Sequence, residues 1–296
     1  MAIDSQIISF QQGGNDRLHG RQILRIEGDV QQMINIYIVY FFVTSFMGYI
    51  YECLAMVLWT GKWDNRGFLY GPIIPIYGSG ALAGTLLFTY GYRNYTPLSV
   101  FVISVVASAI LEYFVHWALE KMFHAYWWDY SKAPLNINGR ISLPTSLGFG
   151  VAGLVIIYVI NPPLLKVLHS IPPLALQIMA LVFIALFSAD LTLTICVLSS
   201  FISRIKSIDD MINQTMEGCV ANHMSDSMRL NDKFFGAIDR IDDVRRRIIN
   251  DRINKADRNK TAFYKRFFYR IRGFKGENFE ILNRVLRRIK DEDNDE

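Results

Sequence analysis

The sequence predicts an all-α fold: a polytopic membrane helical bundle of about five spans, built from a duplicated two-helix unit, with a cytoplasmic helical C-terminal tail. Three observations lead to this prediction. First, 51% of the 296 residues are hydrophobic, and they gather in windows that hold almost no charge. Second, residues 1–201 contain only 10 Lys and Arg and 10 Asp and Glu, so the other 21 and 17 lie in residues 202–296. Third, two stretches of the apolar part carry the same motifs in the same order.

The predicted transmembrane domain, residues 34–202, follows a polar N-terminal extension of residues 1–33. A helix needs about 20 apolar residues to cross a bilayer. Windows of low charge give five candidate spans: Ile36–Trp59, Ile74–Tyr90, Leu98–Leu119, Ser146–Ile160 and Leu174–Ile202. Repeat one covers about residues 36–90 and repeat two about residues 98–160. The second and fourth spans are short and rich in Gly and Pro, so we expect broken or re-entrant helices there.

Residues 203–290 form the predicted tail. Ile205, Ile208 and Ile212 recur at steps of three and four, which is typical of amphipathic helices. The basic and aromatic stretch AFYKRFFYRIRGFKG, residues 262–276, suits an anionic lipid surface, where each cation gains about 1 kcal/mol. Its rings could also stack on bases, but the nearby bilayer favours lipid, and we expect no nucleic-acid partner. Residues 291–296 form an acidic disordered end.

The positions of Lys and Arg near the span ends predict the orientation. One side carries Lys62, Arg66, Lys121, Lys132, Arg140, Arg204 and Lys206, whereas the other has only Arg21, Arg25, Arg93 and Lys166. Cytoplasmic loops carry the excess of positive charge. The tail is therefore predicted to be cytoplasmic, in a multi-pass protein of the cell membrane.

Three acids lie inside apolar stretches: Glu52 in the first span, Glu112 in the third and Asp190 in the fifth. An ionisable group at that depth costs roughly 2.5 to 3.5 kcal/mol, so it usually has a partner or a function. We therefore predict a polar intramembrane site that contains these acids. The alternative is a buried acid that is satisfied by hydrogen bonds to a neighbouring helix.

The two repeats share an order of motifs. After Glu52 comes WDNRGFLYGPIIPIYGSGA, and after Glu112 comes WWDYSKAPLNINGRISLPTSLGFGVAG. Two spans per unit keep both units the same way up, and such parallel repeats place a site where they meet. The alternative is that Gly and Pro are simply common in spanning helices. The motif residues are Asp64, Asn65, Gly67, Gly71, Pro72, Pro75, Gly78 and Gly80 in repeat one, and Trp128, Asp129, Asn138 and Gly139 in repeat two.

Arg66 and Arg140 fall at corresponding places in the two repeats. An arginine there could neutralise a buried acid or bind a carboxylate or phosphate ligand with its fork of donors. Alternatively, Asp64 and Asp129 could pair with these arginines and form an architectural clamp.

The third span carries Glu112, His116, Glu120 and His124 at steps of four residues. Each step advances about 40° past a full turn, so consecutive pairs share a face while the ends of the series diverge. Imidazole and carboxylate suit several metals, but a site needs more ligands than a pair provides. We favour a hydrogen-bonded or proton-relaying Glu112-His116 pair, and we expect neither a metal nor another cofactor.

The strings NRGFLYGPIIPIYGSG, LEYFVHWALEKMFHAYWWDYS and NINGRISLPTSLGFG resemble the signature of the ABC-transporter type IV family, bacterial membrane proteins named as ABC transporter permeases. The resemblance covers about residues 37–202 and extends weakly to FYRIRGFKGENFEILNRVLRRI in the tail. It implies transport and supplies no catalytic residue. Because the chain has no G-x-x-x-x-G-K-[ST] loop, an ATPase would have to be a separate subunit in trans.

Three functions are therefore considered. The favoured one is a permease-like protein with a polar site between the repeats for an unidentified solute, embedded in the bilayer as a monomer or homo-oligomer. A membrane-embedded enzyme or metalloprotein would use Glu112, His116 and Asp190, although the absence of G-x-S-x-G and H-E-x-x-H strings favours a protein that is not an enzyme. The third is a membrane scaffold or sensor that acts through its cytoplasmic tail.

Overall fold

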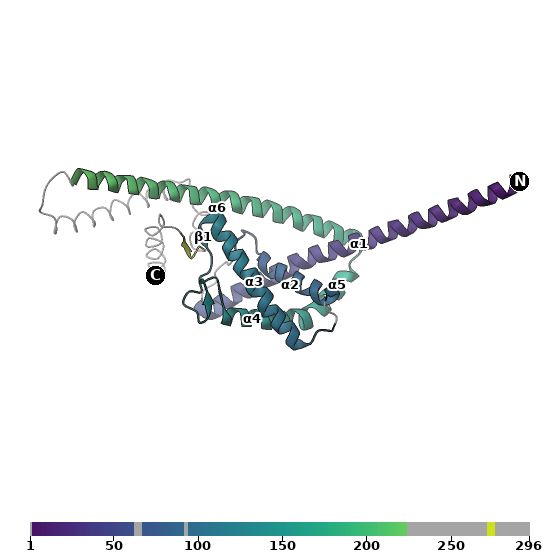
Figure 1. The fold of residues 1–296 in the computed structure, drawn as a ribbon, viewed down its shortest axis with the longest axis horizontal. Coiled ribbons are helices and arrows are strands. Elements are labelled where there is room, and N and C mark those ends of the chain that lie inside the picture. Colours follow the sequence, from purple (N-terminus) through teal and green to yellow (C-terminus); the bar gives the residue numbers. More distant parts are fainter. Residues whose placement is uncertain (1, 62–66, 92–93, 224–270, 276–296) are drawn as a thin grey trace. The chain divides into compact units, whose positions relative to one another are not determined.

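The computed structural model describes residues 2–61, 67–91, 94–223 and 271–275, and this part of the chain is mainly helical (Figure 1). The chain falls into two compact units. Unit one comprises Met1–Asp64, Pro72–Ser108 and Gly148–Ala189. Unit two comprises Asn65–Gly71, Ala109–Leu147 and Asp190–Glu296.

The α-helices of the described residues are α1 (Ala2–Thr60), α2 (Pro75–Leu86), α3 (Pro97–Phe123), α4 (Leu143–Leu154), α5 (Asn161–Ser170) and α6 (Pro173–His223). Short π-helical segments, η1 (Leu87–Gly91) and η2 (Val155–Ile160), continue α2 and α4. Three of the α-helices begin with a proline, which lacks the N–H that would have no helical partner at that position. Helices α3, α4 and α6 contribute residues to both units.

Among the residues that the structure describes, four segments are long and apolar enough to cross a membrane: Glu27–Leu58, Pro97–Phe123, Leu143–Ser170 and Pro173–Ser200. They correspond to the first, third, fourth and fifth predicted spans, and the membrane helical bundle is confirmed. The fourth is longer than predicted, because α4, η2 and α5 form one helical run. The second predicted span, Ile74–Tyr90, forms the 12-residue α2 and the 5-residue η1 and is not among these four.

The two longest of the described helices extend beyond the length of a membrane span (Figure 1). Helix α1 has 59 residues, which is roughly 90 Å at 1.5 Å per residue. Helix α6 has 51 residues and continues from its apolar segment to His223. The predicted boundaries at residues 33 and 203 therefore fall inside continuous helices. Most of the predicted tail, residues 224–270 and 276–296, lies outside the described residues.

Unit one is held together by apolar packing between helices. Its main cluster contains the buried side chains Ile36, Val39, Tyr40, Ala81, Leu168, Leu176 and Ala180, from α1, α2, α5 and α6. A second cluster joins Phe88, Val100 and Ile157, from η1, α3 and η2. These contacts bring most of repeat one and the two ends of repeat two into one unit, whereas residues 109–147 of repeat two belong to unit two.

Unit two contains short strands in addition to helices. Strands β2 (Asn136–Ile137) and β3 (Ile141–Ser142) form a hairpin. Strand β1 (Ala125–Tyr126) pairs with β4 (Gly273–Phe274), which comes from the tail. The core of this unit joins Phe123, Ala125, Trp127, Leu198, Ile271 and Phe274. The tail residues 271–275 thus pack on protein, where the sequence had predicted contact with lipid.

Candidate functional site

Glu52 lies on α1 and accepts a hydrogen bond from the hydroxyl of Tyr77 on α2. The side chain of Tyr77 packs against Gly48, where any Cβ would collide with it. Both Glu52 and Tyr77 are partly buried. The sequence therefore places an acid and a tyrosine opposite each other by leaving out a side chain one turn before the acid.

Two residues of α1 set the register of repeat one. Gly78 packs against Phe41 and Ser45, and a Cβ on Gly78 would come within 2.5 Å of the Phe41 carbonyl oxygen. Phe41 and Ser45 precede Glu52 by eleven and seven residues. Such close approach of two backbones at a small residue is typical of membrane helices.

Repeat two has the same register. Gly150 packs against α3, where a Cβ would come within 2.7 Å of Phe101 and 2.6 Å of Val105. These two residues precede Glu112 by eleven and seven residues, as their counterparts precede Glu52. In both repeats the second helix also has 12 residues and then becomes π-helical. The shared geometry supports the predicted duplication independently of the motif order.

The repeats touch at equivalent residues. Tyr77 precedes Gly78 in repeat one, and Phe149 precedes Gly150 in repeat two; their ring centroids lie 5.9 Å apart. Contact between equivalent positions is expected near an axis that relates two parallel repeats. Glu52, which is bonded to Tyr77, therefore lies beside the contact of the repeats.

Three buried polar residues join α1, α2 and α5. The Tyr40 hydroxyl lies 2.6 Å from Asn161 Oδ1 and 2.9 Å from Thr85 Oγ1, and Asn161 Nδ2 donates to Thr85 Oγ1 at 2.9 Å. The equivalent positions of Tyr40 and Thr85 in repeat two are Val100 and Ile157, which pack together in an apolar cluster. Tyr40 and Thr85 of repeat one are thus polar at positions where repeat two has apolar residues.

Glu112 lies on the part of α3 that belongs to unit two, and its side chain is buried. The hydroxyl of Tyr130 donates a hydrogen bond of 3.0 Å to Glu112 Oε1. Glu52 and Glu112 therefore each accept a hydrogen bond from a tyrosine of their own unit. The two tyrosines come from different parts of the repeats.

A tight turn positions Arg140 beside α3. Asn138 and Gly139 have φ values of 54° and 69°, and the Arg140 N–H donates to the Ile137 carbonyl oxygen at 3.0 Å. Two successive left-handed residues, Asn then Gly, are characteristic of a type I′ hairpin turn. The motif residues Asn138 and Gly139 therefore have a structural role, which is to bring the next residue to the helix.

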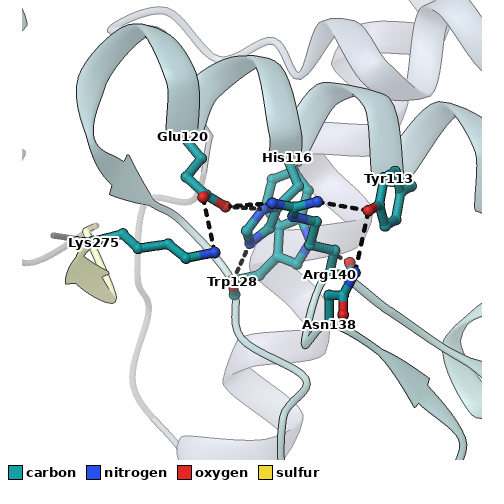
Figure 2. A network of polar contacts seen from close by, with 7 residues as sticks. All are labelled: Tyr113, His116, Glu120, Trp128, Asn138, Arg140 and Lys275. Carbon is teal, nitrogen blue, oxygen red and sulfur yellow. Dashed lines mark hydrogen bonds and ion pairs between the residues drawn. The ribbon is translucent and has the colours of Figure 1, made fainter.

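Arg140 bridges Glu120 and Tyr113, as Figure 2 shows. Its Nη2 donates to Glu120 Oε2 at 3.0 Å, and its Nη1 donates to the Tyr113 hydroxyl at 2.7 Å. Burial lowers the pKa of the guanidinium, but the hydrogen bond to Glu120 and the charge of Glu120 outweigh burial, so the net pKa is raised. Arg140 is therefore charged at any physiological pH, and it pairs with Glu120 rather than with Glu112 or Asp129.

Lys275 of the tail holds the other oxygen of the same carboxylate. Its Nζ lies 2.9 Å from Glu120 Oε1. The Glu120 side chain is only 12% exposed, so this acid is mostly buried and has a cation on each oxygen. Figure 2 shows that the two cations reach it from different segments of the chain.

His116 lies between two hydrogen-bond acceptors. Its Nε2 is 3.1 Å from the Trp128 carbonyl oxygen, and its Nδ1 is 3.7 Å from Glu120 Oε2. Because a carbonyl oxygen only accepts, Nε2 must carry a proton. The predicted Glu112-His116 pair is replaced by these contacts, since His116 faces Trp128 and Glu120.

Asp190 has a different environment from the two glutamates. It accepts hydrogen bonds from the backbone N–H groups of Tyr70 at 3.0 Å and Gly71 at 2.8 Å, and a weaker one from Thr194 at 3.4 Å. A Cβ on Gly71 would come within 2.8 Å of the carboxylate. Asp190 thus holds the bend before Pro72, and Gly71 is the residue that allows the close approach.

The remaining predicted motif residues have varied positions. Asp64, Asn65 and Arg66 lie outside the described residues. Asp129 accepts a hydrogen bond from the Ser131 N–H at 2.9 Å, and Trp128 donates from Nε1 to the Arg140 carbonyl oxygen at 3.0 Å. Gly67 has a φ of 121°, Gly80 is exposed, and Pro75 begins α2.

Within the described ranges, no three His, Cys, Asp or Glu side chains are arranged to hold a metal ion. Three partners of these polar residues were not predicted from the sequence: Tyr77 in unit one, and Tyr130 and Lys275 in unit two. The two tyrosines could have been found by looking for donors opposite each acid, but nothing in the sequence pairs Lys275 with Glu120.

The chain matches a known protein family. The model of the family described as "Putative ABC-transporter type IV" matches residues 39–195, which include Glu52, Glu112 and Asp190. No curated protein and no solved structure matches the chain.

Proposed function

The chain belongs to the ABC-transporter type IV family, and from this membership we propose that it is a permease-like membrane subunit with a polar site for a solute where its two repeats meet. The family match and the four apolar helices agree on a transporter-like membrane protein. We propose, in addition, the location of the site, the class of its solute and the source of energy.

The observation that carries the proposal is the Glu52-Tyr77 hydrogen bond beside the contact of Tyr77 with Phe149. An ionisable residue in a membrane span usually marks a solute or proton pathway. A site between repeats is also where alternating access brings about the largest change in exposure. We therefore assign Glu52 as the acid that contacts the solute, with Glu112 as its counterpart in repeat two.

The chemistry of the Glu52-Tyr77 pair restricts the class of solute that the site can bind. A carboxylate accepts hydrogen bonds and attracts cations, and a tyrosine hydroxyl both donates and accepts. A solute with an ammonium group or several N–H or O–H donors fits such a site, whereas an anion does not. Arg140 is paired with Glu120, His116 is hydrogen-bonded to the Trp128 carbonyl oxygen, and Asp190 holds a backbone turn, so we assign these three residues to architecture.

Energy would come from a separate ATPase, because this chain carries no phosphate-binding loop. The test is purification of the full-length protein from its native membranes in mild detergent, followed by mass spectrometry of everything bound. An ATPase subunit with a phosphate-binding loop and a small solute are expected, relative to an unrelated membrane protein from the same preparation. Purification with neither would contradict the proposal.

One observation favours the scaffold alternative. Tail residues 271–275 pack directly on the loop that follows α3. A scaffold that acts only through its tail would keep its function when Glu52 is replaced by Gln, whereas a permease would lose it.

A further inference from the structure

Strand β1 presents a backbone edge to the tail. The N–H of Arg272 donates to the Tyr126 carbonyl oxygen at 2.8 Å, and the N–H of Lys275 donates to the His124 carbonyl oxygen at 2.9 Å. The strands are antiparallel, with Ala125 opposite Phe274. Addition of an extended peptide to a strand edge is a common mode of peptide recognition, in which the backbone supplies affinity and the side chains supply specificity.

The C-terminal end of α3 sets the direction of strand β1. Helix α3 ends at Phe123, and His124 has a φ of 50° while its N–H still donates to the Glu120 carbonyl oxygen at 2.9 Å. A left-handed residue after the last helical turn is a common helix end. It turns the chain so that β1 follows within two residues of the helix that carries Glu120.

The tail side chains enter an apolar core. Ile271 is 0% exposed and Phe274 is 3% exposed. They pack with Phe123, Ala125, Trp127 and Leu198, residues from α3, the following loop and α6. Ile271 and Phe274, the two apolar residues of this tail segment, are therefore recognised by contacts within unit two.

Gly273 is required by the approach of the two strands. A Cβ at this position would collide with the hydroxyl of Tyr126. Any other residue would push the tail away from β1 or displace the tyrosine, so the edge selects glycine between Arg272 and Phe274.

Lys275 adds recognition of charge. Its ammonium group contacts Glu120 Oε1 at 2.9 Å, while Arg140 contacts Oε2 at 3.0 Å (Figure 2). Without Lys275, one oxygen of a mostly buried carboxylate would lose its cation. Docking of the tail therefore completes the charge pairing of a residue on a membrane helix.

We propose that the segment His124–Trp127, together with Glu120, is a strand-addition peptide site whose ligand is the chain's own segment Ile271–Lys275. The site reads the pattern Ile-x-Gly-Phe-Lys by backbone pairing, two apolar contacts, one glycine and one ion pair. When segment Ile271–Lys275 is bound, it holds the tail against the end of α3. When this segment leaves, the site can bind a separate peptide of the same pattern. This proposal is independent of the solute site at Glu52.

The first test measures hydrogen exchange of the full-length protein in detergent. We expect the Gly273→Val variant to exchange at least tenfold faster in residues 271–275 and in residues 124–126, because the tail leaves the edge. The matched control is Gly28→Val, where a Cβ would meet no atom within 4 Å. Lys275→Gln should accelerate exchange severalfold, whereas Lys121→Gln, which removes an exposed cation next to Glu120, should not. Unchanged exchange in Gly273→Val would overturn the proposal.

The second test supplies the ligand in trans. A fluorescent peptide with the sequence RIRGFKG should bind the Gly273→Val protein at least tenfold more tightly than a peptide in which Val replaces the glycine. It should bind the wild-type protein more weakly, because the wild-type site holds its own tail. Equal binding of both peptides, or no binding, would overturn the proposal. So would tail protection that appears only when anionic lipid is added to the micelles, because the segment would then be held by lipid.

Discussion

Arg140 and Glu120 are stable at the end of α3 because each neutralises the other. Their side chains are 11% and 12% exposed. Removal of one partner of a mostly buried pair costs about 3 to 5 kcal/mol. Because Lys275 still contacts the other oxygen of Glu120 when Arg140 is removed, we expect the lower end of this range.

The predicted result is a lower free energy of unfolding in Arg140→Met, by about 3 kcal/mol. The double variant Arg140→Met with Glu120→Gln should lose less than the sum of the two single variants, because the charge that remains without its partner is that of Lys275, whose side chain is 58% exposed. The measurement is a double-mutant cycle by thermal or chemical unfolding in detergent, with exposed Lys132→Met as the control. Additive losses would show that the two residues do not interact.

The pH dependence of this pair follows from the raised pKa of Arg140. A cation with a raised pKa stabilises the fold at all pH values below that pKa, and the stabilisation is lost only as pH rises through it. The coupling energy of the cycle should therefore stay constant from about pH 7 to 8, since the guanidinium stays charged throughout this range. A decrease over this range would mean that another group, with a lower pKa, carries the interaction.

Gly78 tests the close approach of α1 and α2. Its Cβ would come within 2.5 Å of a backbone carbonyl oxygen, which cannot move by side-chain rotation. Gly78→Ala should therefore lower the unfolding temperature, whereas Gly148→Ala, with no atom within 4 Å of its Cβ, should leave it unchanged or raise it. A stabilised Gly78→Ala protein would contradict the described packing.

At the scale of helices, the Tyr40, Thr85 and Asn161 triad joins three elements by hydrogen bonds. Such bonds between membrane helices contribute about 0.6 kcal/mol each on average. A buried polar group that loses its partner costs more than a pair replaced by apolar groups of similar shape.

We therefore expect Asn161→Leu alone to destabilise unit one by about 1 to 3 kcal/mol. The triple variant with Tyr40→Phe, Thr85→Val and Asn161→Leu should be more stable than this single variant, because repeat two already has Val100 and Ile157 at the equivalent positions. Unfolding in mixed micelles compares the two proteins. A triple variant that is less stable than Asn161→Leu would contradict the equivalence of the repeats.

The helices were predictable from the sequence because lipid permits few alternatives to an apolar helix. The lengths of α2 and of the fourth span were less predictable, since Gly, Pro and the π-helical segments break the hydropathy pattern. The order of motifs predicted the duplication, and the equal spacing of Phe41 and Phe101 before the acids agrees with it. The partners of the polar residues were not predictable, because they depend on the rotation of each helix.

At the scale of the whole molecule, the sequence grouped Glu112, His116 and Arg140 in one site. The described contacts instead place His116 and Arg140 on Glu120, together with a lysine 155 positions later in the chain. A pattern in one sequence carries no information on such a distant pair. Hydropathy could not predict the docking of residues 271–275 either, because their basic and aromatic composition also suits a lipid surface.

The orientation remains a prediction of the positive-inside rule. A green fluorescent protein fused after Glu296 should fluoresce, because it folds in the cytoplasm, whereas alkaline phosphatase fused there should be inactive. The control is the same pair of fusions at Arg93, which lies on the predicted outer side and should give the opposite result. Active phosphatase at Glu296 would reverse the orientation.

The proposed function depends on Glu52, which we expect to bind the solute where the repeats meet. The most direct measurement compares the small molecules retained by purified wild-type protein, Glu52→Gln and Glu27→Gln, by quantitative mass spectrometry. Glu27 lies on the same helix and is exposed, so it controls for the loss of one negative charge. We expect one solute that is bound by the wild type and by Glu27→Gln, and whose bound amount is at least tenfold lower in Glu52→Gln. Equal amounts of every bound molecule in all three proteins would contradict it.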